Sequence, residues 1–330
     1  MSDKAQETWI GVDLGGTKVY AAVYDADYRM LGEERTKTKG FEGQQAGVRR
    51  IIKSIELAMV AAGRSAQDLD GIGVACPGPI NLNKGVLLSA PNLGWKNVEL
   101  KLELETAFKC PVALLNDVDA GVYGEYVFGA GRNAHCLVGV FPGTGVGGGC
   151  VYEGKVLRGK KHTAFEIGHI PLQPDGPLCG CGQRGCLEAL CSRLSIAVAA
   201  TAAAYRGDAP HLLEKTDLKL SKVRSGTLRD AIKAGDKAVE RIVEQAAEWM
   251  GVGIATVVNL LSPDVVVLGG GLVEAMPELI ASTAERVARK RVLPTFRDSF
   301  EVTLAKLGDE AGVRGAAAWA RQEVTQHGAT

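Results

Sequence analysis

The chain opens with a strand, a glycine-rich turn and a second strand, and the same pattern returns in the middle of the sequence. The first copy of the pattern covers residues 9–24, around Gly15-Gly16-Thr17. The second covers residues 136–152, around Gly143-Thr144-Gly145. Two strands joined by a short glycine turn make a β-hairpin. Because further strands and helices are expected after each hairpin, the sequence predicts two related α/β halves.

Both turns have the composition of an anion site. Glycine permits positive φ and close backbone approach, so the N–H groups of such a turn are little covered. Concave arrays of N–H groups bind anions, phosphate in particular. Neither turn leads into a helix, which separates both from Walker and Rossmann loops. A hairpin without a ligand is the plain alternative for one turn, but two turns that each carry a threonine favour phosphate binding. Asp13, just before the first turn, is a candidate for holding the hydration shell of Mg²⁺.

A third glycine cluster, Gly269-Gly270-Gly271, follows the buried strand expected at 264–268. Bare backbone at that position suits a flat ring such as adenine. Hydrophobic spacing predicts helices between and after the glycine clusters, at residues 48–62, 117–127, 187–204, about 225–261 and 311–322.

Three of the eight cysteines lie within eight residues, in Cys179-Gly-Cys181-x4-Cys186, and His169 lies ten residues before the first of them. Three thiolates and one imidazole complete a tetrahedral Zn²⁺ set. The alternative is a surface loop of free thiols, which would be reactive in the cytoplasm at this density. Four protein ligands leave no open position, so the predicted zinc is structural.

Composition excludes several classes of protein. Lys+Arg and Asp+Glu both number 38, so no net positive field favours nucleic-acid binding. Hydrophobic residues make up 46%, which argues against disorder. We expect no membrane span and no signal region at the N-terminus, and therefore a cytoplasmic protein. The chain is too long for a disulfide scaffold.

Asn116-Asp117 falls where a strand is expected to end and a helix to begin. Catalytic carboxylates are favoured at such strand ends in α/β proteins. Asp also suits the N-cap of the helix that follows. From position alone the two interpretations of Asp117 are equal.

Several of these motifs resemble known ones. Val12-Asp-Leu-Gly-Gly-Thr-Lys18, Phe141-Pro-Gly-Thr-Gly-Val-Gly147 and Val266-Val-Leu-Gly-Gly-Gly271 resemble the two phosphate motifs and the adenosine motif shared by actin, hexokinase and the heat-shock chaperone ATPases. Within that group, Glu166-Ile-Gly-His169 followed by Cys-Gly-Cys-Gly-x-x-Gly-Cys-Leu-Glu188 resembles the ROK family (repressor, open reading frame, kinase). The resemblance extends from about Trp9 to Trp319.

The resemblance implies an α/β fold of two ribonuclease-H-like, actin-like ATPase domains with a cleft between them. We expect residues 1–116 plus 312–330 to form the small domain, with the first phosphate motif and part of the sugar site. Residues 117–311 would form the large domain, with the second phosphate motif, the zinc loop and the adenosine motif. The C-terminal helix, from Ala311 onward, would pack on the N-terminal domain.

The resemblance also implies an ATP-dependent hexose kinase of carbohydrate metabolism and glycolysis, with glucose as the first candidate sugar and Asp117 as general base. The expected sugar-binding residues are Gly78, Asn92, Asn116, Asp117, Glu166, His169 and Glu188. The expected ATP and Mg²⁺ residues are Asp13, Gly15, Gly16, Thr17, Lys18, Gly143, Thr144, Gly145, Gly269, Gly270 and Gly271. The expected structural Zn²⁺ ligands are His169, Cys179, Cys181 and Cys186.

Alternatives stay open within and beyond this class. The sugar could instead be fructose, N-acetylmannosamine, N-acetylglucosamine or another hexose, and polyphosphate is a less favoured donor. A sugar sensor without catalysis is the alternative from another class. A repressor would need a helix-turn-helix domain ahead of the first phosphate strand, and we expect no room for one before Trp9. Phe165 stands where the family usually has glycine, next to Glu166. ROK kinases are commonly homodimers or homotetramers.

Overall fold

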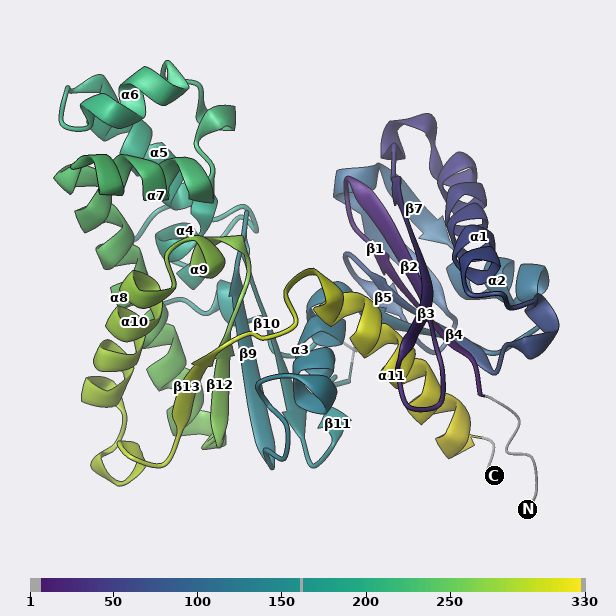
Figure 1. Ribbon diagram of the computed structural model, residues 1–330. Helices are drawn as coiled ribbons and strands as arrows, with labels where there is room; N and C mark the ends of the chain where they lie inside the picture. Colours follow the sequence, from purple (N-terminus) through teal and green to yellow (C-terminus); the bar gives the residue numbers. More distant parts are fainter. Residues whose placement is uncertain (1–6, 161–162, 328–330) are drawn as a thin grey trace. The chain divides into compact units, whose positions relative to one another are not determined.

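The computed structural model describes residues 7–160 and 163–327 (Figure 1). Residues 1–6, where no signal region is expected, residues 161–162 before Glu166, and residues 328–330 lie outside the described part. The chain divides into two compact units. Unit 1 comprises residues 1–132, 156–164 and 309–330, and unit 2 comprises 133–155 and 165–308.

Unit 1 contains a five-stranded sheet in the order β3-β2-β1-β4-β8. Its strands are β1 (Trp9–Leu14), β2 (Lys18–Tyr24), β3 (Met30–Lys37), β4 (Gly71–Cys76) and β8 (Val112–Asn116). β1 and β2 pair antiparallel as the predicted hairpin, whereas β4 pairs parallel with both β1 and β8. The carboxyl ends of β1, β4 and β8 therefore share one edge of the sheet.

Both faces of this sheet are covered, which matches the nearly continuous apolar sequence of β1 and β4. Alternate residues of β1 face opposite cores: Ile10 and Val12 join the cluster with α1, while Trp9 joins the cluster with α11. The helices of unit 1 are α1 (Gln44–Ala61), α2 (Leu100–Phe108), α3 (Asp117–Phe128) and α11 (Ala311–His327). The predicted packing of the C-terminal helix on the N-terminal domain is confirmed.

Helix α11 lies so close to the sheet that only glycine fits beneath it. A Cβ at Gly11 of β1 would lie 1.8 Å from the carbonyl oxygen of Val313, and one at Gly73 of β4 would lie 1.8 Å from that of Ala316. Both obstructing atoms are backbone, so neither can rotate away. The close packing of α11 thus depends on the missing side chains of the two strands.

We expect Gly73→Ala to destabilise the protein by about 3 kcal/mol or more, because overpacking against backbone forces the helix to move. Gly121→Ala is the matched control, since a Cβ at Gly121, on α3, meets no atom within 4 Å. The control should be neutral or slightly stabilising because alanine favours helix. Urea unfolding measures both. Equal stability of the two variants would contradict this account of the α11 packing.

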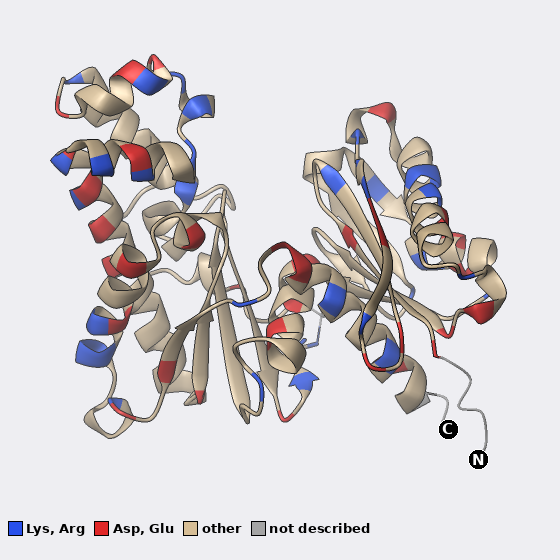
Figure 2. Ribbon diagram, in the orientation of Figure 1, with Lys and Arg blue, Asp and Glu red and all other residues tan. Residues whose placement is uncertain are grey.

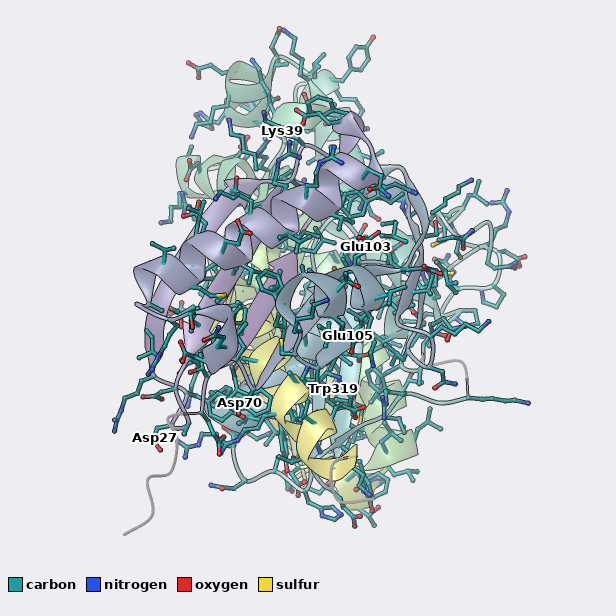
Figure 3. The ribbon with its side chains drawn as sticks, turned by 90° about the vertical axis from the view of Figure 1, so that its right-hand side faces the viewer. Asp27, Lys39, Asp70, Glu103, Glu105 and Trp319 are labelled. Carbon is teal, nitrogen blue, oxygen red and sulfur yellow. The ribbon has the colours of Figure 1, made fainter. Side chains whose placement is uncertain are left out.

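The unit boundary differs from the expected domain boundary at residue 116, because α3 and residues 156–164 belong with unit 1. A Cβ at Gly315 of α11 would lie 1.8 Å from the Ala120 carbonyl oxygen of α3, so these helices are in close contact. Trp319, labelled on α11 in Figure 3, packs edge-on to Tyr123 of α3 with ring centroids 5.7 Å apart. The Arg158 guanidinium lies 4.8 Å from the Trp319 ring. These contacts were not visible as local sequence patterns.

Unit 1 also holds a small antiparallel sheet that the sequence analysis did not predict. It consists of β5 (Ile80–Asn81), β6 (Val86–Ala90) and β7 (Trp95–Val98).

Short 3-10 helices occur in both units. They are η1 (Gly40–Glu42), η2 (Ala66–Asp68), η3 (Pro91–Leu93), η4 (Ile167–His169), η5 (Leu220–Lys222), η6 (Pro294–Phe296) and η7 (Gly308–Glu310).

Unit 2 repeats the strand order of unit 1. Its sheet runs β11-β10-β9-β12-β13, with β10 antiparallel to β9 and with β12 parallel to both β9 and β13. The strands are β9 (Cys136–Pro142), β10 (Val146–Tyr152), β11 (Lys155–Val156), β12 (Val265–Leu268) and β13 (Glu301–Leu304). The prediction of two related α/β halves is confirmed.

The helices of unit 2 are α4 (Leu187–Cys191), α5 (Arg193–Tyr205), α6 (Pro210–Thr216), α7 (Ser225–Ala234), α8 (Lys237–Leu261), α9 (Gly271–Ala275) and α10 (Pro277–Arg291). The helix expected at about 225–261 is two helices. Gly235 ends α7 with φ 110°. The Asp236 carboxylate then accepts hydrogen bonds from the N–H groups of His211 and Leu212.

Charged residues of both signs are interspersed along the helices of each unit, while the strands of unit 2 are mostly uncharged (Figure 2). This distribution agrees with the formal net charge of zero. One stretch of the described chain, Leu187–Tyr205, has the length and hydropathy of a membrane span. Leu187, Ile196 and Ala200 of that stretch are buried in the core of unit 2, as in a core helix of a globular protein.

Candidate active site

The first glycine loop (Gly15–Lys18) joins β1 to β2 in unit 1. It is closed by a hydrogen bond from the Gly15 N–H to the Lys18 carbonyl (2.9 Å). Thr38, which the sequence analysis did not select, holds the loop from outside: its hydroxyl donates to the Gly15 carbonyl (2.7 Å) and its N–H to the Thr17 carbonyl (3.0 Å). Gly16 and Thr17 are exposed. The loop is thus rigidly held and open to solvent.

Positive φ does not explain the two glycines of this loop. Gly15 and Gly16 are absent from the residues with φ in that range, contrary to the reason given above for their presence. A Cβ at Gly16 would lie 3.6 Å from the Cβ of Asn92 in η3. Asn92, an expected sugar-binding residue, therefore lies beside the first glycine loop.

Asp13 and Asp117 lie at the same edge of the unit 1 sheet, at the ends of β1 and β8. The N-cap of α3 is Asn116, whose Oδ1 accepts from the N–H groups of Val118 (2.9 Å) and Asp119 (3.3 Å). Asp117 is the first residue of the helix, and its Oδ1 also accepts from the Val118 N–H (2.9 Å). The capping alternative for Asp117 is therefore wrong, because Asn116 fills that role.

Burial changes the acidity of both carboxyl groups. It raises the pKa of Asp13 to about 6, and the negative charges of Asp117 and Asp309 act in the same direction. Burial also raises the pKa of Asp117, although hydrogen bonds from its surroundings oppose this. Among the described residues, none donates a hydrogen bond to the Asp13 carboxylate. A partly buried carboxylate without a partner is a suitable outer-sphere site for a hydrated divalent cation.

We expect Asp13→Asn to stabilise the ligand-free protein by about 2–3 kcal/mol at pH 7, since each pKa unit corresponds to about 1.4 kcal/mol. The folded state binds this proton more tightly than the unfolded chain. The destabilising effect is therefore present above pH 6 and disappears as the pH falls toward 4. Urea unfolding at pH 7 and pH 4.5 measures the difference. Asp298→Asn, on an exposed residue, is the matched control; an equal gain there would contradict burial as the cause.

Lys18 is neutralised within unit 1. Its ammonium lies 2.7 Å from Oδ2 of Asp309, in η7 just before α11, and the Arg35 guanidinium lies 3.7 Å from the same oxygen. Asp309 was not predicted, because 291 residues separate it from Lys18. The expected role of Lys18 in binding ATP therefore requires competition with a carboxylate already in place.

The second glycine loop (Gly143–Gly145) joins β9 to β10 in unit 2. The Gly143 N–H donates to the Gly145 carbonyl (2.8 Å), and the Val146 N–H that follows donates to Oε2 of Glu188 (3.1 Å). A Cβ at Gly145 would lie 2.3 Å from that Glu188 oxygen. Glycine is needed at 145 so that the carboxylate can approach the loop.

The three residues of the third glycine cluster have different roles. Gly269 is buried, and a Cβ there would lie 2.5 Å from the Phe141 ring, so this glycine serves internal packing. Gly270 adopts φ 85°, a conformation that favours glycine. Gly271 is exposed, opens α9, and has no atom near its Cβ position. Only Gly271 presents bare backbone of the kind expected for an adenine ring. The Gly269 N–H donates to the Val140 carbonyl of β9 (3.2 Å), so this cluster adjoins the strand that leads into the second glycine loop.

The four predicted zinc ligands converge in unit 2. The ligand atoms of His169, Cys179, Cys181 and Cys186 all lie within 4.8 Å of one another. The Sγ atoms of Cys181 and Cys186 are 3.7 Å apart, and Cys179 Sγ is 3.7 Å from His169 Nδ1. Ligands about 2.3 Å from a tetrahedral Zn²⁺ would be about 3.8 Å from one another. The donor set and its spacing therefore fit zinc.

The chain was compared with known proteins. Residues 9–323 match the ROK family. The chain belongs to the ROK family. It is 33% identical to a glucokinase of Thermotoga maritima, over 96% of this chain and 98% of that protein.

Two solved structures extend this comparison. A ROK hexokinase from Thermus thermophilus superposes with a TM-score of 0.83 at 34% identity, over 97% of this chain and 99% of that one. A ROK glucokinase from Streptomyces griseus, solved in complex with glucose and AMPPNP, superposes with a TM-score of 0.80 at 32% identity, over 96% and 99%. The expected actin-like fold of two ribonuclease-H-like domains is confirmed by these neighbours.

Phe165, at the position where the resemblance leads us to expect glycine, has a backbone conformation that favours glycine. Its φ is 67°, in the left-handed region that costs a non-glycine residue about 1–2 kcal/mol. A Cβ at Gly148 would lie 3.1 Å from the Phe165 ring, so the ring lies close against β10. Glu166, which precedes η4, and His169, the last residue of η4, are both exposed. The residue before Glu166 is thus left-handed even though it carries a large side chain.

The structure brings the selected residues together in two sets. Within unit 1, Asp13 and Asn116 lie in the last residues of β1 and β8, Asp117 follows β8, and Asn92 lies beside the first glycine loop. Gly78 follows β4 with φ 84°, and a Cβ there would lie 2.0 Å from the Ser89 carbonyl oxygen, so its small size serves packing against β6. Within unit 2, Glu188 lies against both the second glycine loop and the thiol of Cys179, which is 3.4 Å from its Oε1. Glu188 therefore connects the predicted zinc site to that loop.

Proposed function

We propose that this chain is a sugar kinase that transfers the terminal phosphoryl group of ATP to a hexose, with glucose converted to glucose 6-phosphate. The observation that carries the proposal is the paired architecture: two units of identical strand order each present an open glycine-threonine loop. The whole-length similarity to glucokinases supports this activity, and the glucose and AMPPNP of one such relative support the substrates.

Asp117 is the proposed general base. Its carboxylate would accept the proton of the attacking sugar hydroxyl while the oxygen forms a bond to the γ-phosphorus, and the bond from that phosphorus to the ADP oxygen breaks. A raised pKa increases the basicity of the carboxylate, so it accepts this proton more readily. Asn116 has its Oδ1 committed to capping α3, so its Nδ2 is the atom left for a neighbouring hydroxyl.

The glycine loops are proposed to hold the phosphates through backbone N–H groups, with Thr17 and Thr144 adding hydroxyl donors. Mg²⁺, when bound, neutralises phosphate charge, and Asp13 would hold it through water. In unit 2, Glu166, His169 and Glu188 are proposed to bind further sugar hydroxyls. The zinc site would hold His169 and Glu188 in fixed positions. Action in the cytoplasm, a place in glycolysis, and a homodimeric or homotetrameric state remain predictions.

A coupled assay of ADP release tests the function across glucose, fructose, N-acetylmannosamine and N-acetylglucosamine, with ATP or polyphosphate as donor. Phosphorus NMR of the product identifies the phosphorylated oxygen. We expect the highest kcat/KM with glucose and ATP, and glucose 6-phosphate as product. Turnover restricted to another hexose would reassign the substrate. Tight sugar binding without turnover of any sugar would overturn the kinase and favour a sensor.

A further inference from the structure

Arg193, which the sequence analysis did not select, contacts the second glycine loop through both its backbone and its side chain. It is the first residue of α5. Its N–H donates to the Gly143 carbonyl (2.9 Å), and its guanidinium Nη2 donates to the Thr144 hydroxyl oxygen (2.7 Å). The side chain is therefore held directly at the loop proposed to bind phosphate.

The charge of Arg193 is not neutralised by a neighbouring carboxylate. Within the described part of the chain, no Asp or Glu oxygen lies within ion-pair distance of its guanidinium. Glu188, five residues earlier, accepts a hydrogen bond from the Val146 N–H at its Oε2 and forms no ion pair with Arg193 in the described part of the chain. Lys18 at the first glycine loop differs in this respect, because Asp309 lies 2.7 Å from its ammonium.

A guanidinium has five N–H donors in a planar fork that matches the oxygens of phosphate. The contact with Thr144 uses one of them, and the side chain is partly exposed. The remaining donors are free for an anion at the loop. Thr144 can accept from Arg193 and still donate its own proton to a phosphate oxygen.

We propose that Arg193 binds the phosphate chain of the nucleotide at the second glycine loop. This inference rests on the proposed function for the identity of the nucleotide. Charge-assisted hydrogen bonds to phosphate are stronger than neutral ones. Arg193 thus supplies positive charge where the backbone N–H groups supply only dipoles.

Equilibrium binding of ATP, ADP and AMP to the full-length protein tests the proposal without requiring turnover. We expect Arg193→Met to weaken ATP binding roughly ten- to a hundredfold, ADP less, and AMP least. Arg193→Lys should recover part of the loss, because it restores charge without the fork. Arg206→Met, at the other end of α5 and paired with Asp208 at 3.1 Å, is the matched control and should bind as the wild type does.

The competing explanation is that Arg193 only positions Thr144. Thr144→Val would then reproduce the whole loss, and adding Arg193→Met to it would change nothing; that result overturns the proposal. So would ATP affinity unchanged in Arg193→Met, an equal loss for all three nucleotides, or a wild type that binds none. If ATP binding depends on Arg193 but no hexose is phosphorylated, the inference stands and the proposed kinase activity fails.

Discussion

Asp117→Asn is expected to lower kcat about 10²–10⁴-fold, the usual contribution of a positioned general base. The dissociation constants for glucose and ATP should change by only a few-fold. Asparagine keeps the size of the side chain and an oxygen that can accept from the Val118 N–H, as Oδ1 of Asp117 does at 2.9 Å. It cannot accept the proton of the sugar hydroxyl. Steady-state kinetics and calorimetric binding of each substrate separate the two effects.

A kcat near that of the wild type would remove Asp117 from the base role. Urea unfolding separates loss of catalysis from loss of folding. Neutralising a carboxyl group with a raised pKa should make the ligand-free protein more stable rather than less. The pH profile gives a second check. Wild-type kcat/KM should fall as the pH drops through apparent pKa values above the ordinary range, which belong to the interacting pair Asp13 and Asp117. Asp117→Asn should lose the part of this pH dependence that comes from the base and keep the part that comes from Asp13, whose pKa burial raises to about 6.

The local parts of the fold could be predicted because the sequence encodes them locally. The two hairpins were located from apolar runs on either side of glycine turns, and β9 and β10 appear where expected. The convergence of the predicted zinc ligands could be expected for the same reason, since three thiols within one short loop cannot lie far apart. His169, ten residues before Cys179, is the last residue of η4, and its side chain lies beside the three thiols.

The remaining contacts depend on packing between distant segments. Arg193 meets Thr144 across 49 residues, and Asp309 meets Lys18 across 291. Neither pair could be predicted from the spacing of residues within a short stretch of sequence. The division into compact units differs from the expected domain boundary for a similar reason: α3 follows β8 directly, but its close contact with α11 groups it with unit 1. The break between α7 and α8 was signalled by Gly235 and was missed because the apolar periodicity continues beyond it.

Zinc is expected to be the largest single contribution to the order of the loop at 169–186. Purified protein should contain one zinc per chain, and Cys186→Ser should lose it. Structural zinc sites supply folding free energy directly. A loss of about 4 kcal/mol would lower Tm by about 10 °C, at roughly 2–4 °C per kcal/mol for a unit of this size. Elemental analysis and thermal unfolding measure the two effects.

Cys110→Ser is the matched control, because it makes the same change at a buried thiol of unit 1 outside the cluster. It should retain one zinc per chain. Since Glu188 contacts both Cys179 and the Val146 N–H, loss of zinc should also loosen the second glycine loop. We therefore expect Cys186→Ser to raise KM for both glucose and ATP. If loss of zinc displaced only the proposed sugar-binding residues, KM would rise for glucose alone. An intact fold with no zinc in the wild type would refute the metal site, and the four converging side chains would then need another explanation.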